Sequence, residues 1–235
     1  MEDRDTPVTL VTGASRGIGR HLAEHYVQRG HRVVGCSRGE TTLSHPRYRH
    51  ECLDVRDEAA VTSLFSAIRK ELGRLDHLVN NAGVASMNHA LLTPVGTVEK
   101  LLAINATASF LFAREAAKIM KGARFGRIVN FTTVAVPLKL EGEAAYVASK
   151  AAVEAFTQVL ARELSEFGIT VNALGPTPVE TDLIGNVPEA KIESLIRRQA
   201  IPRMGTLDDV TNVVDFFLDR RSDFVTGQIL YLGGV

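Results

Sequence analysis

The sequence predicts an α/β fold, a doubly wound parallel sheet of about seven strands with helices on both faces. Short apolar runs alternate with amphipathic helical patterns along the whole of the 235 residues. The first run leads directly into a glycine-rich turn and a helix, at Gly13-Ala-Ser-Arg-Gly17-Ile-Gly19. No linker, repeat or low-complexity tract interrupts the alternation, so residues 1–235 are expected to form one domain.

Charge and composition exclude several classes of protein. Lys+Arg and Asp+Glu are equal at 27 each, which argues against a nucleic-acid or anionic-membrane surface. The two cysteines, Cys36 and Cys52, have no metal-ligand spacing and are expected to be reduced, so we predict no metal site. The N-terminus is charged, and no apolar run approaches the roughly 20 residues that span a bilayer. We expect a cytoplasmic protein with no membrane partner.

The first strand and the turn after it indicate a phosphate-binding loop. Val8–Thr12 is apolar and β-branched, and the helical pattern behind the glycines stops at Gly30. Glycines allow a backbone to approach a pyrophosphate, and a helix N-terminus offers free N–H groups. The alternative is an ordinary strand-to-helix turn. The predicted cofactor-binding residues here are Gly13, Ser15, Arg16, Gly17, Ile18 and Gly19.

The second strand, His31–Cys36, ends in Ser37 and Arg38. In a nucleotide-binding fold an acid at this point holds the 2′-OH of NAD, whereas an arginine accommodates the 2′-phosphate of NADP. No acid stands here, and Arg16 could reach the same phosphate. We therefore predict NADP(H) over NAD(H); the alternative is two solvated surface arginines.

The remaining elements follow in order. After an irregular connection we expect a strand at Arg47–Leu53, a helix from Asp57 to Gly73, a strand at Leu75–Val79 and a long helix at Val98–Lys121. Then come a strand at Gly126–Thr133, a helix from Ala144 to Gly168, a strand at Ile169–Leu174, a helical excursion at Thr181–Ala200, a helix from Thr206 or Asp208, and a strand at Val225–Leu232. Asn105 lies inside the long helix although Asn is a mediocre helix former, which indicates either surface placement or a distorted turn with a function.

The helix from Ala144 carries Tyr146 and Lys150, which are four residues apart and share one face. A phenol is a weak acid with a pKa of about 10, and a nearby ammonium favours its ionised form. Such a pair can supply a proton donor or acceptor. The alternative is a half-buried Tyr beside a solvated Lys.

Ligands of parallel sheets bind beyond the carboxyl ends of the strands, and the polar and glycine-rich segments of this chain follow those ends. Beyond the residues already named, the segments at strand ends supply Asp54, Val55, Asn81, Ala82, Gly83, Thr133, Pro176, Val179 and Thr181. Their convergence predicts a single site, which no one motif would do.

Together these motifs resemble the short-chain dehydrogenase/reductase family, a Rossmann-fold family, over nearly the whole chain. Thr12–Gly19 is similar to its T-G-x-x-x-G-x-G loop, Asn80-Asn81-Ala82-Gly83 to its N-N-A-G stretch, and Tyr146/Lys150 to its catalytic pair. The chain most resembles the NADPH-dependent 3-oxoacyl-carrier-protein reductases.

The resemblance implies a carbonyl reductase or alcohol dehydrogenase. Tyr146 would exchange a proton with the substrate oxygen, Lys150 would hold the nicotinamide ribose and lower the pKa of Tyr146, and Asn105 would position a water. Asp54 and Val55 would meet the adenine, and Val179 and Thr181 the carboxamide. The substrate would be a small carbonyl or alcohol compound or a carrier-bound acyl group. Pairing through the two long helices would give a homodimer or homotetramer.

Two departures from the family pattern stand out. Thr133 occupies the position thirteen residues before Tyr146 where the family has Ser, and its extra methyl takes room from the pocket. Pro176-Thr177-Pro178 replaces a Pro-Gly turn with a stiffer one. Two other functions stay open: a nucleotide-binding sensor or scaffold with little turnover, and an epimerase or dehydratase. The chain lacks the length for the larger substrate domain of the latter.

Overall fold

The computed structural model describes residues 6–181 and 188–235. Within them seven strands form one sheet in the order β3-β2-β1-β4-β5-β6-β7, and every pairing is parallel. The strands are β1 (Val8–Thr12), β2 (Arg32–Ser37), β3 (Tyr48–Cys52), β4 (His77–Asn80), β5 (Gly126–Phe131), β6 (Ile169–Gly175) and β7 (Ile229–Tyr231). The chain reverses its direction of winding between β1 and β4, so the doubly wound prediction is confirmed.

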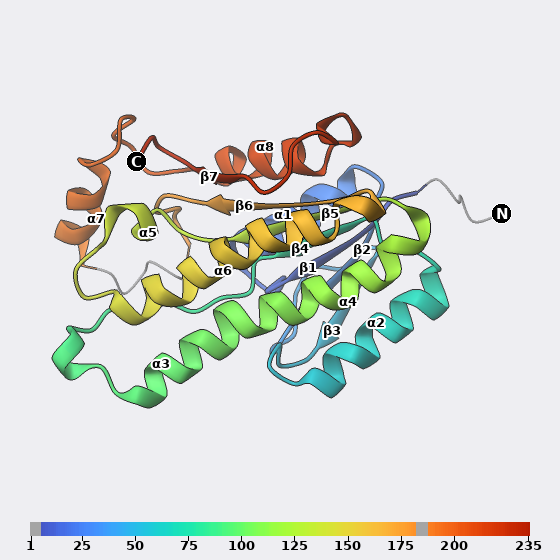
Figure 1. Ribbon diagram of the computed structural model, residues 1–235, viewed down its shortest axis with the longest axis horizontal. Coiled ribbons are helices and arrows are strands. Elements are labelled where there is room, and N and C mark those ends of the chain that lie inside the picture. The colour runs from blue at the N-terminus through green and yellow to red at the C-terminus, as the bar shows by residue number, and fades with distance from the viewer. Residues whose placement is uncertain (1–5, 182–187) are drawn as a thin grey trace.

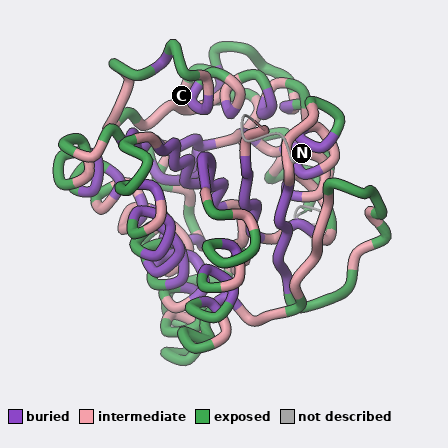
Figure 2. Tube along the Cα trace, turned by 90° about the vertical axis from the view of Figure 1, so that its right-hand side faces the viewer, coloured by how far each residue is buried: buried purple, intermediate pink, exposed green. Residues whose placement is uncertain are grey.

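Helices cover both faces of this sheet (Figure 1). One face carries α1 (Gly17–Gln28) and α8 (Leu207–Leu218), and the other α2 (Glu58–Leu72), α4 (Ala108–Ala123) and α6 (Ala144–Glu163). Strand β1 shows why two cores form: Val8 and Leu10 pack toward the second group of helices, and Val11 packs toward the first. Figure 2 shows the central strands buried and the outward sides of the helices exposed, while the edge strands β3 and β7 are intermediate.

Short helices complete the fold. They are η1 (Ala90–Leu92), α3 (Val95–Leu101), η2 (Leu102–Thr107), α5 (Ala135–Leu138), η3 (Ser165–Phe167), α7 (Glu189–Ile196) and η4 (Arg220–Ser222). Two helix starts follow the capping chemistry of the sequence. Asp57 accepts a 3.0 Å hydrogen bond from the Ala60 N–H, and Thr206 with Asp209 forms a capping box, which resolves the choice between Thr206 and Asp208. As predicted, the described stretch between β2 and β3 forms no helix.

The long helix is continuous from α3 through α4, and its middle, η2, is a π-helix that contains Asn105. The segment Val95–Ala123 spans 29 residues and is apolar enough, by length and composition alone, to cross a membrane. Our prediction that no apolar run approaches the roughly 20 residues that span a bilayer was therefore wrong for this helix. In the fold this helix packs on the sheet and on α2 and α6, so its apolar residues serve the core. The cytoplasmic location stays a prediction.

Some predicted bounds were wrong. The last strand begins at Ile229, not Val225, because Gly227 turns with φ +70° and the Asn172 side chain bonds the Val225 carbonyl and the Gln228 N–H in place of a ladder. The helix from Ala144 ends at Glu163, and η3 leads on to Gly168. Of the excursion predicted at Thr181–Ala200, residues 182–187 lie outside the described part, and α7 accounts for eight of the others.

Candidate active site

The glycine loop is held against the end of β4 by its neighbours. Gly13 has φ +70°, and a Cβ on Gly19 would lie 2.3 Å from the Gly13 carbonyl oxygen, closer than any real contact. The Asn81 amide donates to the Thr12 carbonyl at 2.9 Å, and the Ala82 N–H donates to Thr12 Oγ1 at 2.9 Å. The Gly13 and Ala14 N–H groups donate to the Cys36 carbonyl at 2.8 and 3.2 Å, so the N–H groups left for a ligand are those at the start of α1.

That cavity, of about 420 Å³, contains the predicted adenosine side of the site. Both Arg16 and Arg38 line it, and Ser37 and Arg38 stand at the end of β2 where an NAD-binding protein has an acid. Ser37 is nearly buried, and its hydroxyl donates to the Gly39 carbonyl at 2.7 Å. The Ser37 hydroxyl thus holds the turn in which Arg38 lies. Ser37 is buried, whereas Arg38 is exposed.

Asp54 lies in the same cavity and has a partner that the sequence reading missed. Arg56 binds its carboxylate through Nη2 at 2.6 Å and Nε at 3.0 Å, and the Arg56 N–H adds a third contact at 3.0 Å. These hydrogen bonds lower the pKa of Asp54 to about 2. The carboxylate therefore stays ionised throughout the physiological range, with lone pairs left for an exocyclic amine.

A second, larger cavity of about 880 Å³ adjoins the first. Both are lined by Ile18, Asn81, Gly83, Val84 and Thr181, so they form one continuous cleft along the carboxyl ends of the strands. Of the predicted site residues, all line one cavity or the other except Gly19 and Asn105. Gly19 packs closely against the Gly13 carbonyl of the loop, and Asn105 is fully buried and lines neither cavity.

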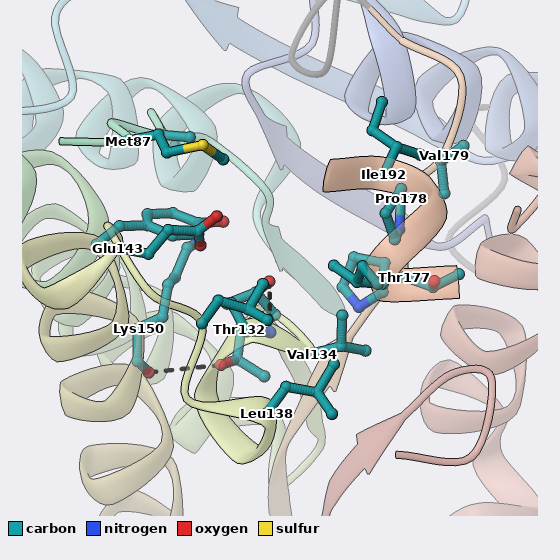
Figure 3. Close-up of a pocket in the computed structure, with 18 of the residues that line it drawn as sticks. Met87, Thr132, Val134, Leu138, Glu143, Lys150, Thr177, Pro178, Val179 and Ile192 are labelled. Atoms are coloured by element: carbon teal, nitrogen blue, oxygen red, sulfur yellow. Dashed lines mark hydrogen bonds between the residues drawn. The ribbon is translucent and has the colours of Figure 1, made fainter. Parts of the chain in front are cut away.

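Tyr146, Lys150 and Thr133 share the wall of the larger cavity. Helix α6 supplies the first two and the end of β5 the third. Figure 3 shows Glu143 and Lys150 on one side of the cavity and Pro178, Val179 and Ile192 on the other. The Lys150 ammonium donates to the Phe131 carbonyl at 2.8 Å, which anchors the helix to β5.

Burial dominates the proton affinities of the pair. It raises the pKa of Tyr146 to about 12, a rise that a hydrogen bond with Thr133 opposes and the Glu143 charge reinforces. It also lowers the pKa of Lys150 to about 8. Lys150 is not among the groups that shift the pKa of Tyr146 in this structure, so the lowering of that pKa by Lys150 stays a prediction.

Asn105 occupies the π-helical turn η2 and is fully buried. Its amide forms a closed pair with Val84, accepting from the N–H and donating to the carbonyl, both at 2.9 Å. It also donates to Ser149 Oγ at 2.9 Å, one residue from Lys150. Surface placement is therefore wrong and the turn is distorted, whereas a functional role of Asn105 stays a prediction. In the structure Asn105 connects the loop after β4 to the helix that carries Tyr146.

The structure shows the hydrogen bonds made at the two departures from the family pattern, Thr133 and the Pro176-Thr177-Pro178 turn. Thr133 Oγ1 accepts from the Ala135 N–H at 3.2 Å, and the Thr133 hydroxyl is hydrogen-bonded to Tyr146 in the cavity wall. Its neighbour Thr132 points elsewhere and donates to Glu154 at 2.5 Å. In the Pro-Thr-Pro turn, Thr177 is buried and donates to Gln199 Oε1 at 2.6 Å, which ties the turn to the segment after α7.

Sequence reasoning missed Glu143 as a site residue, and within the predicted excursion it did not single out Lys191 and Arg198, which also line the cavity. Glu143 precedes Tyr146 by three residues, but no pattern distinguishes a buried carboxylate from a solvated one at a helix start. Lys191 and Arg198 lie in a segment whose polar and apolar residues alternate without a clear period.

The cleft suits an extended dinucleotide. Its first half offers the N–H groups at the start of α1 and two arginines for phosphates, and its second half brings Lys150 close to Gly83, where an added Cβ would lie 3.3 Å from Nζ. A side chain at Gly83 would therefore fill the space between the two halves. The residues present fit a nicotinamide dinucleotide laid across both cavities.

Comparisons with known proteins agree with this geometry. The family model described as enoyl-(acyl carrier protein) reductase matches residues 13–234. The 3-oxoacyl-[acyl-carrier-protein] reductase FabG of Salmonella typhimurium is 31% identical over 233 residues, covering 97% of this chain and 96% of that protein. The ligand-free aldohexose dehydrogenase of Thermoplasma acidophilum superposes with a TM-score of 0.89 at 30% identity, covering 99% of this chain and 94% of that one. The NADP-bound structure of ElxO gives 0.89 at 26% identity and covers 97% of both chains.

Proposed function

We propose that this chain, which belongs to the short-chain dehydrogenase/reductase family of hydride-transfer oxidoreductases and is similar to the 3-oxoacyl-carrier-protein reductases, interconverts a carbonyl and a secondary alcohol with NADP(H). One observation carries the proposal. Tyr146, Thr133 and Lys150 line one cavity, and that cavity is continuous with the cavity of the glycine loop. A substrate oxygen beside Tyr146 would therefore have its carbon next to a nicotinamide.

In the proposed reduction, NADPH supplies the hydride to the carbonyl carbon. The Thr133 hydroxyl donates a hydrogen bond to the carbonyl oxygen and polarises the bond, and the Tyr146 phenol gives that oxygen its proton. Oxidation runs the same transfers backwards. Lys150, held by the Phe131 carbonyl, keeps a positive charge near the phenolate that reduction leaves behind. Asn105 is the proposed anchor of a water that returns the proton to Tyr146.

The proposed preference for NADP(H) rests on Arg16 and Arg38 in the first cavity and on the lack of an acid at the end of β2. ElxO, at 26% identity, has been solved with NADP bound, which supports the same choice.

A spectrophotometric panel tests the proposed activity. Purified protein is mixed with NADPH and, in turn, a ketone, an aldehyde and a β-ketoacyl thioester, and the loss of NADPH absorbance is followed. We expect turnover with at least one class, and turnover lower by roughly 10²–10⁴-fold in Tyr146→Phe. Cofactor binding without turnover across all classes would instead support the sensor or scaffold alternative.

We also propose that the chain forms a homodimer through α4 and α6. Phe110 on α4 is 42% exposed and lies edge-on to Phe156 of α6 at 6.0 Å, and Val159 of α6 is 53% exposed. These side chains are more apolar than a solvated helix pair needs. Light scattering at micromolar concentration should give twice the monomer mass or more, and a monomer mass would refute the proposal.

A further inference from the structure

Glu143 is a carboxylate in the wall of the reaction cavity that the proposed chemistry does not use. The residue immediately precedes α6, yet its side chain makes no capping hydrogen bond to the helix. It is only 9% exposed, and Figure 3 shows it on the same side of the cavity as Lys150. Its charge reaches the Tyr146 phenol, since it contributes to the raised pKa of that group.

This carboxylate has no hydrogen-bond donor among the residues that the structure describes. Lys191 attracts it electrostatically, but the two side chains form no ion pair within 4.0 Å, and the Lys191 ammonium lies against Met87 Sδ instead. Partial burial raises the pKa of Glu143, while its carboxylate oxygens open on the cavity and can accept from water or from a bound molecule. A bound molecule that displaces this water must supply a donor in its place, or the carboxylate is left unpaired.

The chemistry of the cavity limits what that donor can be. Lys139, Lys191 and Arg198 line the cavity along with Glu141 and Glu143, so cations outnumber anions there. A cationic ligand would be repelled by Lys191, which already offsets the charge of Glu143. A neutral hydroxyl brings a donor and no charge.

We propose that Glu143 is a specificity-determining residue that accepts a hydrogen bond from a second hydroxyl group, next to the carbinol that Tyr146 handles. The substrate class is then a vicinal diol, or in the reverse direction an α-hydroxy ketone. This inference rests on the proposed function, since it names the substrate of the same site. It also separates the chain from 3-oxoacyl thioesters, whose two carbonyl groups offer only acceptors and would leave Glu143 unpaired.

Three cyclohexane derivatives test this inference because they differ in one group. The oxidation of trans-1,2-cyclohexanediol, cyclohexanol and trans-2-aminocyclohexanol by NADP⁺ is measured as kcat/KM. We expect the diol to exceed cyclohexanol roughly tenfold or more, since a buried acceptor discriminates strongly against a substrate that lacks the donor. In Glu143→Leu the ratio should fall to about one, while Glu143→Gln, which retains an acceptor oxygen, should keep part of it.

Glu163→Gln is the matched control, because it makes the same charge change at an exposed position at the far end of α6. It should leave the ratio unchanged. A wild-type ratio near one, a ratio unaffected by Glu143→Leu, or a clear preference for the amino alcohol would each overturn the inference while leaving the oxidoreductase proposal intact.

If none of the three alcohols is oxidised, the proposed alcohol chemistry fails for this class, and binding decides the inference. NMR titration of the diol and of cyclohexanol into the NADP⁺-saturated protein then replaces kinetics. Tighter binding of the diol in the wild type but not in Glu143→Leu supports the inference, and equal affinities overturn it.

Discussion

The carboxylates in the two halves of the cleft differ in their hydrogen-bond partners and in the direction of their pKa shifts. In the glycine-loop half, Asp54 is bound by Arg56 and its pKa falls to about 2. In the reaction half, Glu143 has no hydrogen-bond donor among the described residues and burial raises its pKa. The first half is therefore complete in itself and presents a preorganised surface. The second leaves a charge that faces the cavity and takes its hydrogen bonds from water or from a bound ligand, which is typical of a region that selects substrates.

Tyr146→Phe tests the reaction half with the largest expected effect. Losing the proton donor should reduce kcat by roughly 10²–10⁴-fold, the usual contribution of general acid–base catalysis. NADPH affinity, measured by fluorescence titration, should stay within error because the loop half is untouched. A variant with wild-type kcat would show that another group transfers the proton.

Thr133 is expected to act through its hydroxyl. Thr133→Val removes a donor to the substrate oxygen and should lower kcat by roughly 10²–10³-fold. Thr133→Ser keeps the hydroxyl and frees room for the substrate, so its kcat should equal or exceed that of the wild type. Equal kcat values for the Val and Ser variants would mean that the hydroxyl has no role.

Arg38→Asp tests the loop half through its charge. The wild type should bind NADPH roughly 10-fold more tightly than NADH at low salt, since a 2′-phosphate gains a charge-assisted pair. The variant should invert the order by repelling the phosphate and offering the ribose an acceptor. Added salt should shrink the wild-type preference because Arg38 is exposed. A wild-type ratio at or below one contradicts the assignment of the β2 end.

Gly19→Ala tests how closely the loop is packed. Its Cβ would meet the Gly13 carbonyl at 2.3 Å, so we expect a loss of about 1–3 kcal/mol in the free energy of unfolding and weaker cofactor binding. Gly122→Ala, in α4 with nothing within 4 Å of the added Cβ, should be neutral or slightly stabilising. Urea denaturation of both variants makes the comparison, and equal midpoints would show that the loop relaxes freely.

The smallest effect concerns pH. The pKa of Glu143 is raised above its ordinary 4.5, so the folded protein keeps this proton to a higher pH than the unfolded chain does. The ionised form then lowers stability as pH rises above about 4.5. Glu143→Gln should therefore raise Tm at pH 7 and have little effect at pH 4. Glu163→Gln should change Tm at neither pH, and an equal rise in both variants would mean a general charge effect.

The two halves of the cleft also differ in how much of each the sequence predicts. The loop half is built from consecutive residues: Val8–Thr12 makes the strand, Gly13 to Gly19 the turn, and Ser37-Arg38 the end of the next strand. Glycine spacing and the position of an acid or arginine are visible along the chain. Yet the hydrogen bonds from Asn81 and Ala82 to Thr12 join segments about 70 residues apart, and only folding shows that they hold the loop.

The sequence by itself determined the parallel sheet, its helices, the glycine loop and the Tyr146/Lys150 face, because each follows from local periodicity and residue type. Tertiary structure alone decided burial and long-range pairing: that Asn105 lies in a π-helical turn, that Thr177 is tied to Gln199, and that Glu143 faces the cavity with no donor among the described residues. The physical reason is that a side chain's charge state and partners depend on what surrounds it in space. For Glu143, elements distant in sequence desolvate an ordinary helix-start carboxylate and raise its pKa.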